Sequence, residues 1–315
     1  MTGAWFEHPA RDNVAPPPWL PRRGWQPRDG GTRVSGGTGR SPASPDRGAS
    51  PASPGRSAPD RPARVGRMPT RLVHMVIDAN DPPKLARFWA AALGWVVEEE
   101  EGAEEVDVSP AGYEYPDPVA LPMVFIPVSE PKAIKNRLHI DLASQSAEHQ
   151  ASLVERLREL GARPLDIGQG DVPWVVLADP EGNEFCVLEP RGAYRDTGPV
   201  AAVVMDAADP VALAGFWELA SGWVRSRSED DNLVGFRSPQ GVGPYFELLR
   251  VPEAKTVKNR VHIDLAPEKG EDQAAAVRQL QEAGAALADV GQGDDVSWVV
   301  LADPDGSEFC VLTPR

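Results

Sequence analysis

The chain has 315 residues and a net charge of −15, and this length favours two domains. Residues 1–67 contain 11 arginines and five acidic residues, a charge of +6, whereas the remainder carries −21. Such an acidic remainder argues against a nucleic-acid-binding surface. No stretch has the apolar length of a transmembrane helix or of a signal-peptide core. We therefore expect neither nucleic acid nor a membrane as a partner.

The first 69 residues are rich in Arg, Pro, Gly and Ser, as in SPASPDRGASPASPGRSAP, and lack apolar periodicity. A segment of this composition buries too little apolar surface to offset its conformational entropy, so residues 1–69 are predicted to be disordered. Two interpretations of it stay open. The segment is either a basic tether or an extension upstream of a functional start at Met68.

The rest of the chain is a tandem duplication. Residues 174–191 and 298–315 are identical at 15 of 18 positions, and KNRLHIDLA at 135–143 recurs as KNRVHIDLA at 258–266. We expect one domain over residues 70–192 and a second over 197–315. Each repeat has one cysteine, Cys186 or Cys310. One cysteine per domain is no disulfide framework, and it fits a reducing cytoplasm.

In chain order, the first repeat opens with an apolar strand over residues 72–79 and a helix that Asp81 caps and Gly94 ends. Three strands are predicted at residues 95–100, 105–109 and 123–128. The order then recurs, with a strand at 137–143, a helix at 147–160 ended by Gly161, and strands at 164–167, 174–178 and 184–188.

The second repeat follows the same order. A strand at 200–207 precedes a helix that Asp209 caps and Gly222 ends, and later pieces include a strand at 245–251 and a helix at 272–283. Each repeat is thus strand–helix–three strands, twice over. The fold class predicted is α+β, with four βαβββ modules.

This module order, together with the segments KNRLHIDL and DPEGNEFCVL, resembles the vicinal-oxygen-chelate superfamily. The superfamily includes glyoxalase I, bleomycin- and fosfomycin-resistance proteins and extradiol dioxygenases. The resemblance covers residues 70–315 and implies two glyoxalase-like domains built from paired modules. It does not imply one reaction, because one fold supports several functions.

Strand alternation indicates which side chains face a ligand. In residues 137–143 the apolar side chains share one face, so His139 and Asp141 lie on the other, as do His262 and Asp264 in the second repeat. In metal-using members of the superfamily, first and last strands of modules supply the ligands. Carried over, this implies the sets His74, His139 and Cys186 in the first repeat and Glu247, His262 and Cys310 in the second.

The chain also departs from the family pattern. The family's closing motif ends in a ligand Glu, and Cys186 and Cys310 occupy that position, which argues against glyoxalase I activity itself. Asp141 or Asp264 would then accept a proton in place of the Glu. A thiolate favours zinc as the metal, with nickel and iron as alternatives. Cysteines that only fill space, and histidines that only bond their neighbouring aspartates, remain the structural alternatives.

Three functions follow from the resemblance. The first is a metal-dependent lyase or isomerase that acts on a small oxygen-rich metabolite. The second is a metal-free protein that binds a small molecule or drug, as the bleomycin-resistance branch does. The third is an extradiol dioxygenase. We expect a monomer whose modules pair within one chain, with a dimer as the alternative.

Overall fold

The protein is described by a computed structural model over residues 68–98, 104–293 and 295–315. The disorder predicted for the tail therefore falls, apart from its last two residues, outside the described part. Four βαβββ modules follow one another, as predicted. The first is β1 (Arg71–Ala79), α1 (Pro82–Leu93), β2 (Val96–Glu98), β3 (Val106–Ser109) and β4 (Met123–Pro127). The second is β5 (Leu138–Leu142), α2 (Ala147–Glu159), β6 (Arg163–Pro164), β7 (Val175–Ala178) and β8 (Glu184–Val187).

A single 3₁₀ turn, η1 (Gly192–Tyr194), connects the second module to the third. The third module is β9 (Val200–Ala207), α3 (Pro210–Ser221), β10 (Val224–Glu229), β11 (Leu233–Arg237) and β12 (Tyr245–Arg250). The fourth is β13 (Val261–Ala266), α4 (Gln273–Glu282), β14 (Ala286–Leu287), β15 (Val299–Ala302) and β16 (Glu308–Val311). None of the helices in this described part is long and apolar enough to cross a bilayer.

The two helices that open the repeats begin and end where the sequence predicts. The Asp81 side chain accepts a hydrogen bond from the Lys84 backbone, and Asp209 accepts from Val211 and Ala212. These side chains satisfy N–H groups that the first turn leaves without a helical partner. Gly94 and Gly222 close the helices in the left-handed conformation that glycine adopts without a Cβ penalty.

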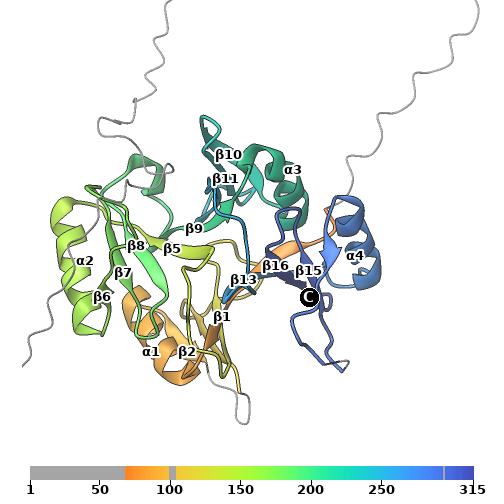
Figure 1. Ribbon diagram of the computed structural model, residues 1–315, viewed down its shortest axis with the longest axis horizontal. Helices are drawn as coiled ribbons and strands as arrows, with labels where there is room; N and C mark the ends of the chain where they lie inside the picture. The colour runs from red at the N-terminus through yellow and green to blue at the C-terminus, as the bar shows by residue number, and fades with distance from the viewer. Residues whose placement is uncertain (1–67, 99–103, 294) are drawn as a thin grey trace, which may run out of the picture. The chain divides into compact units, whose positions relative to one another are not determined.

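Strand pairing joins modules of different repeats. One eight-stranded sheet, sheet A, has the order β14-β15-β16-β13-β1-β4-β3-β2, and the other, sheet B, has the order β10-β11-β12-β9-β5-β8-β7-β6. The first module thus shares sheet A with the fourth, and the second shares sheet B with the third. The central pairs, β1 with β13 and β5 with β9, are antiparallel (Figure 1). Residues 70–192 and 197–315 remain the units of the sequence repeat, whereas each sheet takes one module from each unit.

Within a repeat, the modules meet through helix packing. The Trp89 ring of α1 lies 5.1 Å from the Phe185 ring of β8, and Trp217 of α3 lies 5.5 Å from Phe309 of β16. These aromatic pairs belong to one continuous apolar core that also contains Leu138, Ile140 and Leu142. The predicted alternation of β5 is therefore confirmed. Its apolar face packs in the core, and its polar residues lie on the opposite, open face of the sheet.

Candidate metal centre

Three neighbouring strands of sheet A align polar side chains in one row. Asp264 on β13 is paired in register with His74 on β1 and with Cys310 on β16. His262 precedes Asp264 by two residues on β13 and therefore shares its face of the sheet. The row thus combines one residue from the first module with three from the fourth.

The side chains of this row are within reach of one another. His74 Nε2 lies 2.9 Å from Asp264 Oδ2, and His262 Nε2 lies 3.3 Å from Asp264 Oδ1. The Cys310 Sγ atom lies 3.5 Å from His262 Nε2. The exposed fractions are 15% for the His74 side chain, 12% for His262 and 8% for Asp264. The group is therefore mostly buried, and the two histidines retain some access to solvent.

Burial and the neighbouring imidazoles have opposite effects on the pKa of Asp264 at this centre. Burial alone would raise the pKa of Asp264, but the neighbouring imidazoles of His262 and His74 outweigh it and hold that pKa below its usual range. Burial, and then the Asp264 charge, raises the pKa of the Cys310 thiol. Cys310 is consequently a neutral thiol at neutral pH, and a metal would have to displace its proton.

The donor set suits a divalent ion. His262, Asp264 and Cys310 present one nitrogen, one oxygen and one sulfur within 4.8 Å of one another. The buried Oδ1 of Asp264 lies 3.3 Å from His262 Nε2, in a geometry that makes no hydrogen bond, and has no other partner among the described residues. Imidazole and thiolate together favour zinc over magnesium or calcium. The residues therefore fit a metal of the zinc type.

Sheet B repeats part of this row with one difference. Asp141 on β5 is in register with Cys186 on β8 and with Ala202 on β9, so alanine stands where sheet A has His74. His139 Nε2 lies 3.5 Å from Asp141 Oδ1. Burial, then the Lys135 charge, lowers the pKa of His139 to about 3. Burial, then the Glu247 charge, raises the pKa of Asp141 to about 7.

The ligand sets expected from the order of the repeats are not the sets that the structure brings together. His74 shares sheet A with His262 and Cys310, which it joins through Asp264, and not with His139 and Cys186. Glu247 lies on β12 of sheet B, on the same sheet as His139 and Cys186 rather than His262. The cause is the pairing of modules across the repeats, which regroups residues that the sequence presents in one repeat.

Two tyrosines at these open faces were not anticipated from the sequence. Tyr194, in the connection after β8, is buried on the open face of sheet B. Tyr115, in the loop before β4, packs on the open face of sheet A in the cluster that contains Cys310, and its hydroxyl has no partner among the described residues. Neither lies on a strand, so alternation gives no signal about the direction of either side chain.

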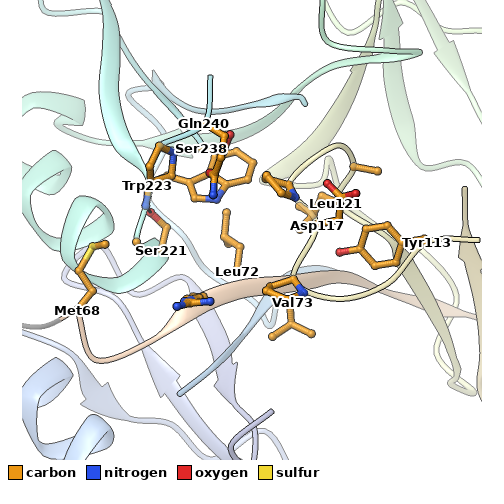
Figure 2. Close-up of a pocket in the computed structure, with 16 residues that line it drawn as sticks. Met68, Leu72, Val73, Tyr113, Asp117, Leu121, Ser221, Trp223, Ser238 and Gln240 are labelled. Carbon is orange, nitrogen blue, oxygen red and sulfur yellow. Dashed lines mark hydrogen bonds between the residues drawn. The ribbon is translucent and has the colours of Figure 1, made fainter. Parts of the chain in front are cut away.

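A cavity of about 210 Å³ lies near the start of β1 (Figure 2). Leu72 and Tyr113 from the first repeat line it together with Trp223 and Ser238 from the second. The four residues of the candidate metal centre are not among its lining residues. The cavity is therefore separate from the polar row, although Val73 borders it next to His74.

A sequence model of the Glyoxalase-like domain matches the chain twice, at residues 74–188 and 202–312. No curated protein matches the chain. Glyoxalase I from Zea mays is similar in structure, with 14% identity, a TM-score of 0.53, and coverage of 78% of this chain and 92% of that one. A single-residue variant of the maize enzyme gives 15% identity, a TM-score of 0.53 and the same coverage.

A glyoxalase/bleomycin resistance protein/dioxygenase family enzyme from Burkholderia phytofirmans is 17% identical with a TM-score of 0.30, over 36% of this chain and 98% of that one. At these identities, the likeness to the maize structures shows the fold alone. The two matches of the domain model cover most of the described residues, one in each repeat. The chain belongs to the family of Glyoxalase-like domain proteins.

Proposed function

We propose that the protein is a metal-dependent enzyme of the lyase or isomerase type, with its working site on the open face of sheet A. Its substrate would be a small oxygen-rich metabolite. One observation carries the proposal: two histidines, a carboxylate and a thiol, drawn from the first and fourth modules, converge in one mostly buried row. Sheet B has Ala202 at the position that corresponds to His74 and is therefore the less suitable sheet for a metal site.

His74, His262 and Cys310 would hold the ion, with zinc favoured over nickel or iron; of the compact set His262, Asp264 and Cys310, the carboxylate is kept free as the base. When bound, the ion would act as a Lewis acid toward a substrate oxygen. Asp264, two residues from His262, would accept a proton at a carboxylate oxygen. The two imidazoles now hold its pKa down.

The test is the metal content of the full chain, measured by elemental analysis after incubation with zinc, nickel or ferrous salts. We expect about one ion per chain. The ion should be lost in His74→Ala and His262→Ala. His139→Ala, which removes the equivalent histidine of sheet B, should retain it and serves as the matched control. Loss of metal in His139→Ala with retention in His262→Ala would contradict the assignment to sheet A.

A metal-free binding protein is the second candidate. Asp264 already hydrogen-bonds His74 and lies 3.3 Å from His262 without an ion, and burial raises the pKa of both cysteine thiols. Absence of metal in every variant would favour this candidate. An extradiol dioxygenase is the third, because sheet A does unite two first-strand histidines, but Cys310 replaces the carboxylate of the last strand. Oxygen consumption with ferrous iron and a catechol would identify it.

The remaining expectations concern the state of the protein in the cell. We propose a cytoplasmic monomer, since both sheets are completed within one chain and both cysteines are free. A stable dimer in sedimentation experiments would contradict the monomer.

A further inference from the structure

The open face of sheet B is filled by a side chain of the connection between the repeats. After β8 the chain forms η1, and Tyr194 at its end lies on this face at 5% exposure. Its neighbours in the apolar cluster include Cys186, Ala202 and Tyr245. The ring thus occupies the place on sheet B that corresponds to the candidate metal centre of sheet A.

The hydroxyl of Tyr194 has a dedicated acceptor. It donates to the carboxylate of Glu247, whose two oxygens lie 3.1 and 3.2 Å away. Glu247 is 1% exposed, and the Arg227 Nη1 atom lies 3.3 Å from its Oε1. Burial, and then the Glu247 charge, raises the pKa of Tyr194, so that the group remains a phenol. A buried carboxylate beside a guanidinium is an acceptor that favours a hydroxyl donor.

The ring itself is held by groups that favour an electron-rich aromatic. Tyr245 meets it edge to face, with ring centroids 5.6 Å apart and planes at 81°. The guanidinium of Arg227 lies 5.1 Å from the ring centroid and that of Arg191 lies 6.0 Å from it. These distances are within the range of cation–π attraction. Arg191 also covers Trp174, at 5.6 Å, so aromatic and cationic groups continue beyond Tyr194.

This set is specific to sheet B. Glu247 pairs with Val204 of β9, and the matching position of β4, Val124, pairs with Val76 of β1. Sheet A therefore has valine where sheet B has the carboxylate that accepts from the phenol. The Asp141 Oδ1 atom is also buried without a hydrogen-bond partner among the described residues, and His139 Nε2 lies 3.5 Å from it. Sheet B thus retains polar groups that the tyrosine does not use.

We propose that the open face of sheet B is a binding site for a phenol, separate from the metal centre of sheet A, and that Tyr194 closes it as an internal ligand. The segment of residues 192–198 acts as a strap over the site. Gly192 and Gly198 stand at its two ends, and Gly198 has a φ of +77°. The strap is held by bonds to backbone carbonyls, from Thr197 Oγ1 to Tyr194 at 3.0 Å and from Arg237 to Asp196 at 3.1 Å.

An external phenol has to displace this strap. The apparent affinity of the wild-type chain is therefore reduced by the fraction of molecules in which the strap is open. Removal of the Tyr194 side chain abolishes the competition and leaves Glu247, Arg227 and Tyr245 in place. A site built around a hydrogen-bonded hydroxyl also discriminates against an analogue that lacks it, because Glu247 is then left unpaired.

The probe is p-cresol, which reproduces the tyrosine side chain, and its binding to the full chain is measured by calorimetry. We expect Tyr194→Ala to bind p-cresol at least about 10-fold more tightly than the wild type. It should also prefer p-cresol to toluene by about 10-fold or more. Tyr113→Ala removes a tyrosine outside sheet B and should bind p-cresol no better than the wild type. The metal content of sheet A should be unchanged in Tyr194→Ala.

Equal binding by Tyr194→Ala and the wild type, or no binding by either, would overturn the proposal. Equal affinity for toluene and p-cresol would also overturn it, since that result describes an unselective apolar cavity. If Tyr194→Ala does not fold alone, it is refolded with each compound. Folded protein recovered with p-cresol but not with toluene supports the site, and failure with both compounds overturns it.

Discussion

His74 and Asp264 are 190 positions apart in the chain, and His74 Nε2 lies 2.9 Å from Asp264 Oδ2. The bond crosses the antiparallel pair of β1 and β13 and connects the first module to the last. The same contact that completes the candidate metal centre therefore also holds the two repeats together in sheet A.

A double-mutant cycle measures this link. We expect His74→Ala and Asp264→Asn to show a coupling of about 1–3 kcal/mol in the free energy of unfolding, because the bond is mostly buried and involves a charged acceptor. Denaturant unfolding of both single variants and the double variant gives this value. His149→Ala serves as the control, since His149 lies on α2 and its ring accepts from the Gln145 backbone just before that helix. Strong coupling of His149 to Asp264 would contradict the pairing.

Glu181 joins three modules through one carboxylate. It accepts hydrogen bonds from the Asn80 and Asp81 backbones, both at 2.8 Å, and pairs with Arg260 of the fourth module at 2.9 Å. Removal leaves the Arg260 charge, with 10% side-chain exposure, without its partner. We expect Glu181→Ala to lower the free energy of unfolding by about 2–4 kcal/mol.

The exposed Glu159 at the end of α2 provides the comparison for Glu181. Glu159→Ala should change the free energy of unfolding by less than about 0.5 kcal/mol. Similar values for the two variants in urea unfolding would show that Glu181 does not bridge the modules.

Gly243 lies where loops of the two repeats are in contact. Its φ is +75°, and a Cβ at this position would overlap with the Pro118 carbonyl oxygen of the first repeat. Gly241 has a similar φ of +70°, but an added Cβ would meet nothing within 4 Å. We expect Gly243→Ala to destabilise by about 2–4 kcal/mol and Gly241→Ala by about 1 kcal/mol. Thermal unfolding compares them, and equal shifts would contradict the close approach of the loops.

Stability should depend on pH through Asp303. This carboxylate accepts from Trp217 Nε1 at 3.0 Å, and burial raises its pKa from 3.8 to about 6 against the hydrogen bonds of Ser307 and Trp217. A raised folded-state pKa means that the native state binds the proton more tightly than the unfolded state does. The contribution is therefore complete below about pH 4 and is lost as pH rises through about 6.

Asp303→Asn does not titrate in this window. From pH 4 to pH 7 the wild type should therefore lose about 2–3 kcal/mol of unfolding free energy relative to the variant. Urea unfolding followed by tryptophan fluorescence measures the difference at each pH. A constant difference between the two proteins across the range would show that the Asp303 pKa is not raised.

The sequence alone determined the local structure and which strand residues lie on the open faces. The caps at Asp81 and Asp209 and the glycines at 94 and 222 are local features, since neighbouring backbone groups satisfy them. The alternation of β5 likewise predicted that His139 and Asp141 face away from the core. The sequence predicts the bounds of a strand less closely where that strand pairs with its neighbour over few residues. The strand expected at residues 164–167 is only Arg163–Pro164, because β6 pairs with β7 over two residues.

Only the tertiary structure decided which residues share a site. The segments LHIDL of β5 and VHIDL of β13 are nearly the same, so the local pattern fits β1 equally well with either. The choice depends on long-range contacts, such as Arg260 with Glu181 and Trp217 with Phe309, which no local pattern contains. Because β1 pairs with β13, His74 bonds Asp264 rather than Asp141. In sheet B, Ala202 stands opposite Asp141, and Tyr194 packs on the open face beside it. Pairing across the repeats thus gave two nearly identical sequences two different sites.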